Sequence, residues 1–363
     1  GRFDLDLDGF TAVRAVDGAG SQHGKNLQRR PYCAARPALR EAPMPADARP
    51  TTAASFQPPV LPRLEPDGEL AHRVRHALDR KTKPPGSLGR LEALALQMAL
   101  VQDRPDPQVA HAEVRVFAGD HGVVAEGVSP YPQAVTAQMV ANFLAGGAAI
   151  SVLARQFEAR LAVVDAGVAA PLGAHPMLLS GRIADGTANF AQGPAMGVTQ
   201  AVAALDAGAA MGRGLAPQSV LVVGEMGIGN TTSSAALMAT LTGLDAAECV
   251  GRGTGVDEAG LARKTAVVRR ALAVNGLDVQ CSESSAAASP DAALRALVAV
   301  GGFEIAMMAG AMLGAASVRA LVVVDGFIAT AAAAVALAID PALKPFLVFA
   351  HVSAEAPHAR WLA

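Results

Sequence analysis

The segment VVGEMGIGNTT, residues 222–232, combines apolar residues, three glycines and polar side chains in an order that could bind an anion. Its valines predict a strand, and its glycines predict a turn directly into a helix. The first N–H groups of a helix lack partners within the helix, and the helix dipole favours negative charge there. The spacing approaches that of a nucleoside-triphosphate loop, but Asn230 occupies the position of the required lysine. We therefore predict a site for a phosphate monoester, built from Gly227, Gly229, Asn230 and Thr231.

Two other interpretations of this loop remain open. A plain strand-to-helix turn, with Thr231 or Thr232 near the start of the helix, would bind no ligand. A nucleoside-triphosphate hydrolase would need Mg²⁺ and the missing lysine, and it would release phosphate from ATP. The absent lysine makes the hydrolase the weakest of the three.

Two glutamates could act on a ligand held by this loop. Glu225 lies inside the glycine-rich segment, where its charge would repel phosphate, so we expect it to contact a ribose hydroxyl or a cationic ring. Glu355 follows the last apolar run, in HVSAEAPH (351–358), among alanines. Burial raises the pKa of a carboxylate, and a glutamate with a pKa near neutrality can act as a general base. An exposed loop glutamate is the ordinary alternative.

Asp120 and His121 end another apolar run and could form an acid/base pair, although adjacent side chains in a turn usually point apart. Too few further ligands surround them for a metal site, so we predict neither a metal nor a cofactor. The helix expected next carries Val135, Met139 and Phe143 on one face. That face should pack in the core, while the first turn could contact a flat aromatic substrate.

Composition excludes several classes of function. The 363 residues have a formal charge of −2 and only 4% aromatic residues, which argues against binding nucleic acid. The three cysteines, Cys33, Cys249 and Cys281, show no paired spacing, as is usual in a reducing cytosol. The apolar stretch Ala329–Ile339 is too short to span a bilayer, and the N-terminal region has no signal-like hydrophobic segment. We expect a cytoplasmic protein without membrane or nucleic-acid partners.

Short apolar runs alternate with alanine-rich stretches of helical periodicity from about residue 66 onward. Such alternation predicts an α/β fold with a doubly wound, mainly parallel, Rossmann-like sheet. Ligands of these sheets bind at the carboxyl ends of the strands. Polar residues that should line this edge are Asp120, His121, Asp165, Glu225, Asp325 and residues 351–355. At any single strand end, ordinary turn chemistry is the favoured explanation, but five such strand ends together are harder to explain in this way.

A series of segments in this chain, together and in order, resembles one enzyme family, the nicotinate-nucleotide–dimethylbenzimidazole phosphoribosyltransferases of cobalamin biosynthesis. The similarity covers about residues 66–358. The segments are KPPGSLGRLE (83–92), AGDHGV (118–123), GVSPYPQAVTAQMVANFLAGGAAI (127–150), VVDAGV (163–168), GTANFAQGPAM (186–196), GEMGIGNTT (224–232), VGGFEIAMMAGAMLGAA (300–316), LVVVDGF (321–327) and HVSAE (351–355).

The resemblance implies a reaction. The phosphoribosyl group of nicotinate mononucleotide moves to 5,6-dimethylbenzimidazole, giving nicotinate and α-ribazole 5′-phosphate without a metal. It implies that Glu355 is the general base, that Glu225 contacts ribose or substrate, and that Lys264 supplies a cation for the phosphate. It also implies that Tyr131, Gln138 and Ser353 contact the benzimidazole. Phe303 and Met307 we assign to the core rather than to the pocket.

The resemblance also implies a homodimer and a small helical domain built from N- and C-terminal segments. We divide the chain into a disordered or non-family extension (1–50), N-terminal helices of the small domain (51–110), a large α/β catalytic domain (111–355) and a truncated end (356–363). Family members continue well beyond the Glu355 motif. The alternative function is therefore a truncated, non-catalytic binder of benzimidazole or mononucleotide.

Overall fold

The computed structural model describes residues 55–253, 255–277 and 289–362. The expected extension, residues 1–50, lies outside the described residues, as do Cys33 and Cys281. Cys249 is a buried free thiol, and burial raises its pKa to about 12, so it is chemically inert at neutral pH.

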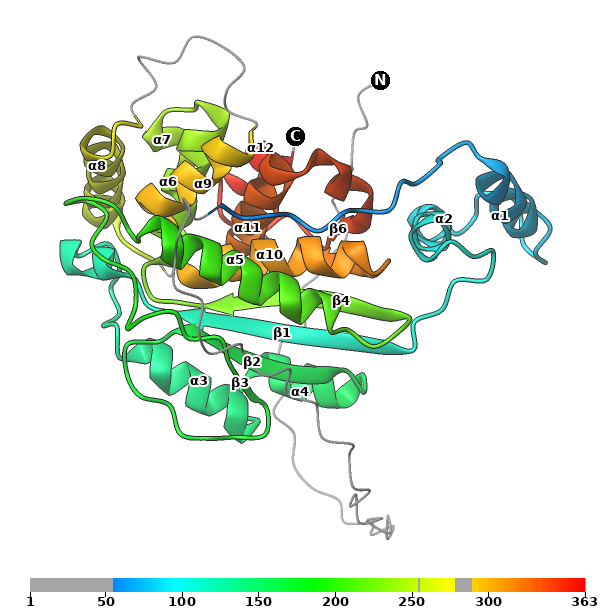
Figure 1. The fold of residues 1–363 in the computed structure, drawn as a ribbon, viewed down its shortest axis with the longest axis horizontal. Coiled ribbons are helices and arrows are strands. Elements are labelled where there is room, and N and C mark those ends of the chain that lie inside the picture. Colours follow the sequence, from blue (N-terminus) through cyan, green and yellow to red (C-terminus); the bar gives the residue numbers. More distant parts are fainter. Residues whose placement is uncertain (1–54, 254, 278–288, 363) are drawn as a thin grey trace, which may run out of the picture. The chain divides into compact units, whose positions relative to one another are not determined.

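Six parallel strands form a single sheet in the order β3-β2-β1-β4-β5-β6 (Figure 1), which confirms the predicted parallel α/β architecture. The order reverses direction between β1 and β4, where ligands of doubly wound sheets bind. The three-residue edge strand β3 was not predicted, because LLS is too short to show a pattern. The strands are β1 (His111–Gly119), β2 (Arg160–Gly167), β3 (Leu178–Ser180), β4 (Ser219–Met226), β5 (Leu321–Val324) and β6 (Leu347–Phe349).

Helices cover both faces of the sheet. Figure 1 shows α3 and α4 on one face, and α5, α6, α9, α10 and α11 on the other. The helices are α1 (Glu69–Asp79), α2 (Arg90–Gln102), α3 (Val135–Ala145), α4 (Ala149–Gln156), α5 (Val198–Arg213), α6 (Asn230–Thr242), α7 (Ala246–Cys249), α8 (Glu258–Val274), α9 (Pro290–Val300), α10 (Phe303–Ser317), α11 (Gly326–Ile339) and α12 (His358–Leu362), with 3₁₀ turns η1 (Gly122–Glu126) and η3 (Pro341–Phe346).

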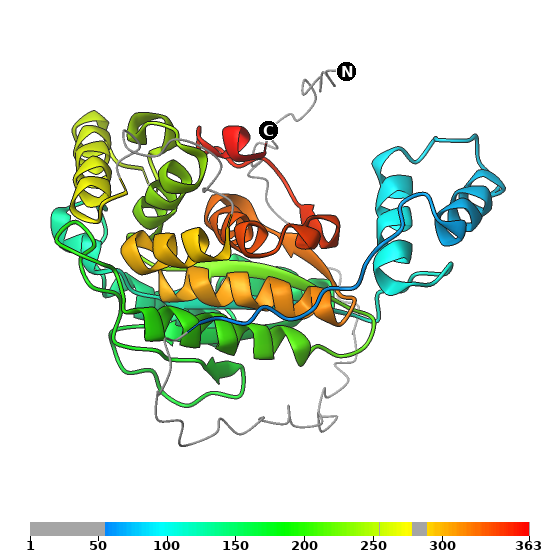
Figure 2. The same ribbon diagram turned by 45° about the horizontal axis from the view of Figure 1, so that its top comes forward.

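Helices α5 and α10 lie side by side (Figures 1 and 2) with their backbones in direct contact. A Cβ atom on Gly208 would lie 1.9 Å from the carbonyl oxygen of Met307, and one on Gly310 would lie 2.0 Å from that of Leu205. Only glycine permits this approach. Residues Phe303–Ala316 of α10 are all buried, which includes the predicted core residues Phe303 and Met307 and, less expectedly, Glu304.

The helix α3 departs from the predicted stripe at its first turn. Phe143 is buried and the partly buried Met139 packs against the same core cluster, so the predicted stripe holds at these two positions, but Thr136 rather than Val135 is buried at the start of the helix. A polar threonine inside the core escaped a search for apolar periodicity. Its hydroxyl has a partner, because the N–H of Ile228 donates to Thr136 Oγ1 at 3.2 Å.

The segment Val135–Gln156 is long and apolar enough to cross a membrane by length and composition alone. It is not one helix, however. Gly146, with a φ of 81°, ends α3 after 11 residues, and α4 has 8. At about 1.5 Å per residue each helix is far shorter than a bilayer core of roughly 30 Å.

Helices α1 and α2 lie in the two segments whose periodicity indicated helices. Helix α2 begins at Arg90 rather than near Ser87, because Gly89 adopts a φ of 51° and the preceding residues form turns. The side chain of Gln97 donates to the carbonyl oxygens of Pro345 and Leu347 at 2.9 and 3.0 Å. These bonds join α2 to the residues that lead into β6. The small domain remains a hypothesis.

Candidate active site

The glycine-rich loop between β4 and α6 packs against the end of β1. Gly229 has a φ of 98°, which favours glycine, and a Cβ there would lie 2.8 Å from Val124 Cγ2. A Cβ on Gly227 would lie 2.5 Å from the carbonyl oxygen of Gly119. The loop therefore depends on both glycines, and it directs the first N–H groups of α6 toward a small cavity.

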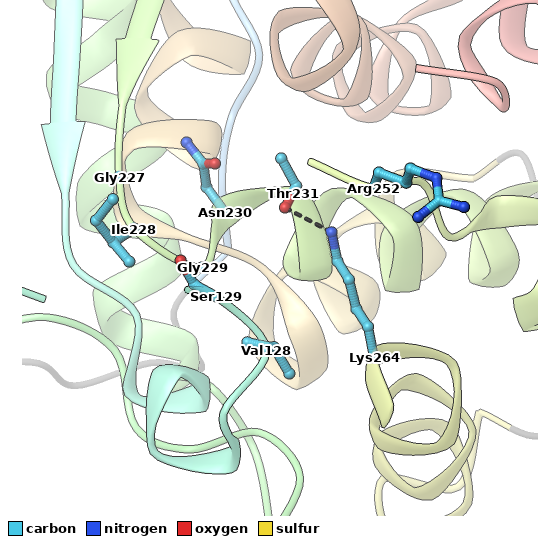
Figure 3. Close-up of a pocket in the computed structure, with 9 residues that line it drawn as sticks. All are labelled: Val128, Ser129, Gly227, Ile228, Gly229, Asn230, Thr231, Arg252 and Lys264. Carbon is cyan, nitrogen blue, oxygen red and sulfur yellow. Dashed lines mark hydrogen bonds between the residues drawn. The ribbon is translucent and has the colours of Figure 1, made fainter. Parts of the chain in front are cut away.

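This cavity collects the predicted phosphate residues. Figure 3 shows the side chains of Thr231 and Lys264 directed toward each other across it. Its lining residues are Val128, Ser129, Gly227, Ile228, Gly229, Asn230, Thr231, Arg252 and Lys264. A helix N-terminus and two cationic side chains thus face one space, which suits a phosphate group.

Lys264 extends from α8 and is buried, with 1% of its surface exposed. Its Nζ donates to Thr231 Oγ1 at 2.7 Å and to the carbonyl oxygen of Gly251 at 3.2 Å. Burial lowers the pKa of Lys264 to about 8, while the Glu355 carboxylate acts in the opposite direction. An anion bound beside Nζ would favour the charged form.

Arg252 is a cavity residue that the sequence did not reveal. Its guanidinium donates to the carbonyl oxygen of Val256 at 3.0 Å and pairs with Glu258. It follows Gly251 in a glycine-rich stretch, GRGTG, and that context is the only local signal. The structure adds it as a second candidate cation for phosphate.

Glu355 lies between β6 and α12, against the backbone of Gly251. A Cβ on Gly251 would lie 1.7 Å from Glu355 Oε2, so the carboxylate occupies the space that glycine leaves. This oxygen is buried and has no hydrogen-bond partner within the described residues. Because Lys264 donates to the carbonyl oxygen of the same glycine, Glu355 lies beside the phosphate cavity. The structure therefore brings Glu355, Lys264 and Thr231 together.

Glu225 lies near the end of β4 and is engaged differently. The side-chain amide of Asn230 donates to Glu225 Oε2. Burial raises the pKa of Glu225 to about 7, an effect that Asn230 opposes and that the charge of Glu304 increases. Glu225 and Asp325 also line a separate apolar cavity of about 480 Å³ between α3, α4 and the sheet.

A buried ion pair that the sequence did not reveal lies beneath the glycine-rich loop. His121 Nε2 is 2.6 Å from Glu304 Oε1, and both side chains are 0% exposed. The charge of Glu304 and its hydrogen bond outweigh the effect of burial and raise the pKa of His121. The pairing joins positions 183 residues apart, so no local motif could predict it.

Three predicted benzimidazole contacts lie outside the phosphate cavity. Tyr131 is 49% exposed, and Gln138 is exposed on α3. Ser353 is partly buried, and its Oγ lies 2.9 Å from His358 Nδ1.

Asp165, one of the polar strand ends, accepts hydrogen bonds from the N–H groups of Gly167 and Val168, which is ordinary turn chemistry.

No cluster of three or more potential metal-ligating side chains occurs within 55–253, 255–277 and 289–362.

Comparisons with known proteins place the chain in a family. A family model described as "Phosphoribosyltransferase" matches residues 64–363. The nicotinate-nucleotide–dimethylbenzimidazole phosphoribosyltransferase of Cupriavidus necator is 53% identical over 301 residues, covering 82% of this chain and 84% of the relative. The enzyme of the same name from Aromatoleum aromaticum is 50% identical over 300 residues, with coverage of 82% and 84%.

A solved structure agrees with these sequence relatives. The crystal structure of CobT from Thermus thermophilus superposes with a TM-score of 0.74 and is 44% identical in sequence. The match covers 81% of this chain and 86% of that one. This chain belongs to the nicotinate-nucleotide–dimethylbenzimidazole phosphoribosyltransferase family.

Proposed function

We propose that this chain transfers the phosphoribosyl group of nicotinate mononucleotide to 5,6-dimethylbenzimidazole, forming α-ribazole 5′-phosphate and nicotinate. Family membership at about 50% identity over most of the chain supports the reaction. One observation carries the mechanism. The buried Glu355 Oε2 lies without a hydrogen-bond partner in the described structure, beside a cavity lined by a helix N-terminus and Lys264.

The phosphate of nicotinate mononucleotide would bind along the Gly227–Thr231 backbone at the start of α6, with Lys264 and Arg252 supplying positive charge. The N–H groups of Ile228 and Asn230 already donate to Thr136 Oγ1 and to the carbonyl oxygen of Gly227, so the other N–H groups of this segment would contact the phosphate. Charge-assisted hydrogen bonds of this kind are stronger than neutral ones. A monoester carries less charge than a triphosphate, so a single buried lysine and a helix end suffice without a loop lysine. Glu225, with its carboxyl held by Asn230, would contact the ribose.

The transfer needs one base. One benzimidazole nitrogen attacks C1′ as the C1′–N bond to nicotinate breaks. The electron pair of the breaking bond moves to the nicotinate nitrogen and neutralises its positive ring. The proton on the second benzimidazole nitrogen passes to Glu355. Attack on the face opposite the leaving group inverts the β anomer to the α product. An acceptor oxygen that no described neighbour already occupies is the group this step requires.

Tyr131, Gln138 and Ser353 we retain as proposed benzimidazole contacts. An exposed hydrogen bond contributes about 0.5–1 kcal/mol, so Tyr131→Phe and Gln138→Ala should each raise the KM for the benzimidazole about two- to fivefold. The KM for nicotinate mononucleotide should not change. An unaltered benzimidazole KM in both variants would remove them from the site.

We also propose a cytoplasmic homodimer that binds neither nucleic acid nor membrane, which light scattering and sedimentation with vesicles would test.

The activity itself is tested by incubating the protein with nicotinate mononucleotide and 5,6-dimethylbenzimidazole and separating products by chromatography. We expect free nicotinate and α-ribazole 5′-phosphate in equal amounts, with no added metal. Binding of both substrates by calorimetry without product would instead identify a non-catalytic binder.

A further inference from the structure

We infer that His358 is a positioning residue for this reaction: as a neutral imidazole it holds the loop that carries Glu355 against the start of α11. The inference rests on the proposed role of Glu355 as the base. His358 is 0% exposed although it is only three residues from that glutamate. A histidine buried this fully so close to a functional carboxylate calls for a physical explanation.

The hydrogen bonds of His358 define its tautomer. The backbone N–H of Ser353 lies 2.8 Å from His358 Nδ1, and a backbone N–H can only donate. Nδ1 is therefore an unprotonated acceptor, and the ring proton is on Nε2. Burial and the neighbouring His351 both lower the pKa of His358, which supports the neutral form.

The other side of the ring continues the chain of hydrogen bonds. His358 Nε2 lies 2.9 Å from Thr330 Oγ1, and the Thr330 hydroxyl is 2.8 Å from the carbonyl oxygen of Gly326. The carbonyl can only accept, so the Thr330 hydroxyl donates to it and accepts a hydrogen bond from His358 Nε2–H. Each hydrogen bond in this series therefore has a defined donor and acceptor. It connects the Ser353 backbone to the first turn of α11, which directly follows β5.

These contacts hold a short loop at both ends. Besides the bond between Ser353 N–H and Nδ1, the N–H of His358 donates to the carbonyl oxygen of Glu355 at 2.9 Å. Phe327 packs against both the His358 ring and Trp361, with ring centroids 6.2 and 5.4 Å apart, which holds α12 on α11. The loop is thereby fastened to α11 while the Glu355 side chain remains against Gly251.

This arrangement has a chemical consequence. The Glu355 side chain has no hydrogen bond of its own to fix Oε2 among the described residues, so its direction depends on its backbone. A displacement of a catalytic group by about 1 Å can reduce a rate about 10²-fold. Loss of the His358 contacts should therefore lower the rate of the chemical step and leave phosphate binding intact.

The test uses variants that separate the acceptor from the ring. In His358→Leu the hydrogen bonds of the ring to Ser353 and to Thr330 are all lost, and kcat should fall about 10- to 100-fold, while the KM for nicotinate mononucleotide stays within about twofold. In His358→Asn the side-chain oxygen can replace Nδ1 as the acceptor for Ser353 N–H, so most of kcat should return. Thr330→Val should cause a smaller loss, and Thr330→Ser should restore it.

Two controls make the result specific. His175 also accepts a backbone N–H at Nδ1, from Met177 at 3.2 Å, but lies in the connection between β2 and β3. His175→Leu should leave kcat unchanged. Adding His358→Leu to Glu355→Gln should cause little further loss, because the two residues act in one step.

Three outcomes would overturn the inference: wild-type kcat in His358→Leu, an equal loss in His358→Leu and His358→Asn, or independent losses in the double variant. If His358→Leu does not fold, Thr330→Val and Thr330→Ser give the same decision. A product-forming wild type with an inactive Glu355→Gln would show that the proposed function stands even where the role of His358 fails.

Discussion

Two glutamates border the proposed site, and their surroundings are opposite. Glu225 lies near the end of a central strand, with one carboxyl oxygen bonded to Asn230 and a buried ion pair nearby. Glu355 lies in a loop after the edge strand β6, and its buried oxygen has no hydrogen-bond partner in the part of the chain described. The central carboxyl is committed to the protein, while the peripheral one is available to a substrate.

The comparison shows how one fold places the same side chain in two different surroundings. A carboxyl that already accepts a hydrogen bond from the protein is held in one orientation and could orient a ligand. The Glu355 carboxyl lies on a loop that is held through its backbone, so its oxygen Oε2 stays available to accept a proton. Position in the fold therefore distinguishes the proposed binding glutamate from the proposed base, although the two are the same residue type.

The largest expected effect separates the two glutamates by rate. Glu355→Gln should lower kcat by about 10²- to 10⁴-fold, the usual range for loss of a general base. Glu225→Gln keeps an acceptor for Asn230 and should lower kcat less than about tenfold. The measurement is nicotinate release at saturating substrates. Equal losses in the two variants would end the distinction between base and binding residue.

A second variant displaces Glu355 without altering it. Gly251→Ala places a methyl group where Glu355 Oε2 now lies, so the carboxylate must move. We expect kcat to fall about 10- to 100-fold, with Glu225 unaffected. Gly173→Ala is the matched control, because a Cβ at Gly173 would contact nothing within 4 Å. Full activity in Gly251→Ala would show that the position of Glu355 is unimportant.

The phosphate cations provide a pH test. Lys264 has a pKa of about 8, below its ordinary 10.5, so its charge is present at lower pH and is lost as pH rises through 8. The Kd for nicotinate mononucleotide should therefore increase above about pH 8. Lys264→Met should weaken binding about tenfold at pH 7 and remove this pH dependence. Arg252→Met should weaken binding but leave the pH dependence in place, since arginine does not lose its proton in this range.

The smallest effect concerns the stability of the fold. Glu225 has a pKa raised from 4.5 to about 7, so the folded state binds its proton more tightly than the unfolded state does. The resulting stability is present below about pH 4.5 and is lost as pH rises through 7. Relative to wild type, Glu225→Gln should gain about 1–3 kcal/mol between pH 5 and pH 8. Denaturant unfolding at both values measures it, and a constant difference would contradict a buried, proton-binding Glu225.

The sequence was sufficient to predict the parallel sheet and the glycine loop. Continuous apolar runs indicate strands that are buried on both faces of a sheet. The glycines Gly227 and Gly229 between a strand and a helix indicate a tight turn that presents the N-terminus of the helix. The strand ends then placed Glu225 and Glu355 at the same edge of the sheet. These predictions depend on local patterns, which a single chain displays directly.

The remaining parts of the site depend on contacts between distant segments. Nothing near His121 indicates that its partner is Glu304, because the pair forms only when α10 packs beneath β1. Arg252 resembles any other loop arginine until α8 brings Lys264 beside it. At the start of α3 the prediction chose Val135 over Thr136, because nothing local shows that the Thr136 hydroxyl accepts the N–H of Ile228 from a distant loop.

The contact between α5 and α10 limits how this protein can change. At Gly208, Gly212, Gly310 and Gly314 one added carbon would overlap a main-chain atom of the facing helix, so the two helices have no smaller adjustment available to them. Evolution or engineering cannot tune this junction in gradual steps, as it can a junction of leucines and valines. Substitutions at these four glycines should therefore disrupt the packing of the two helices rather than adjust it.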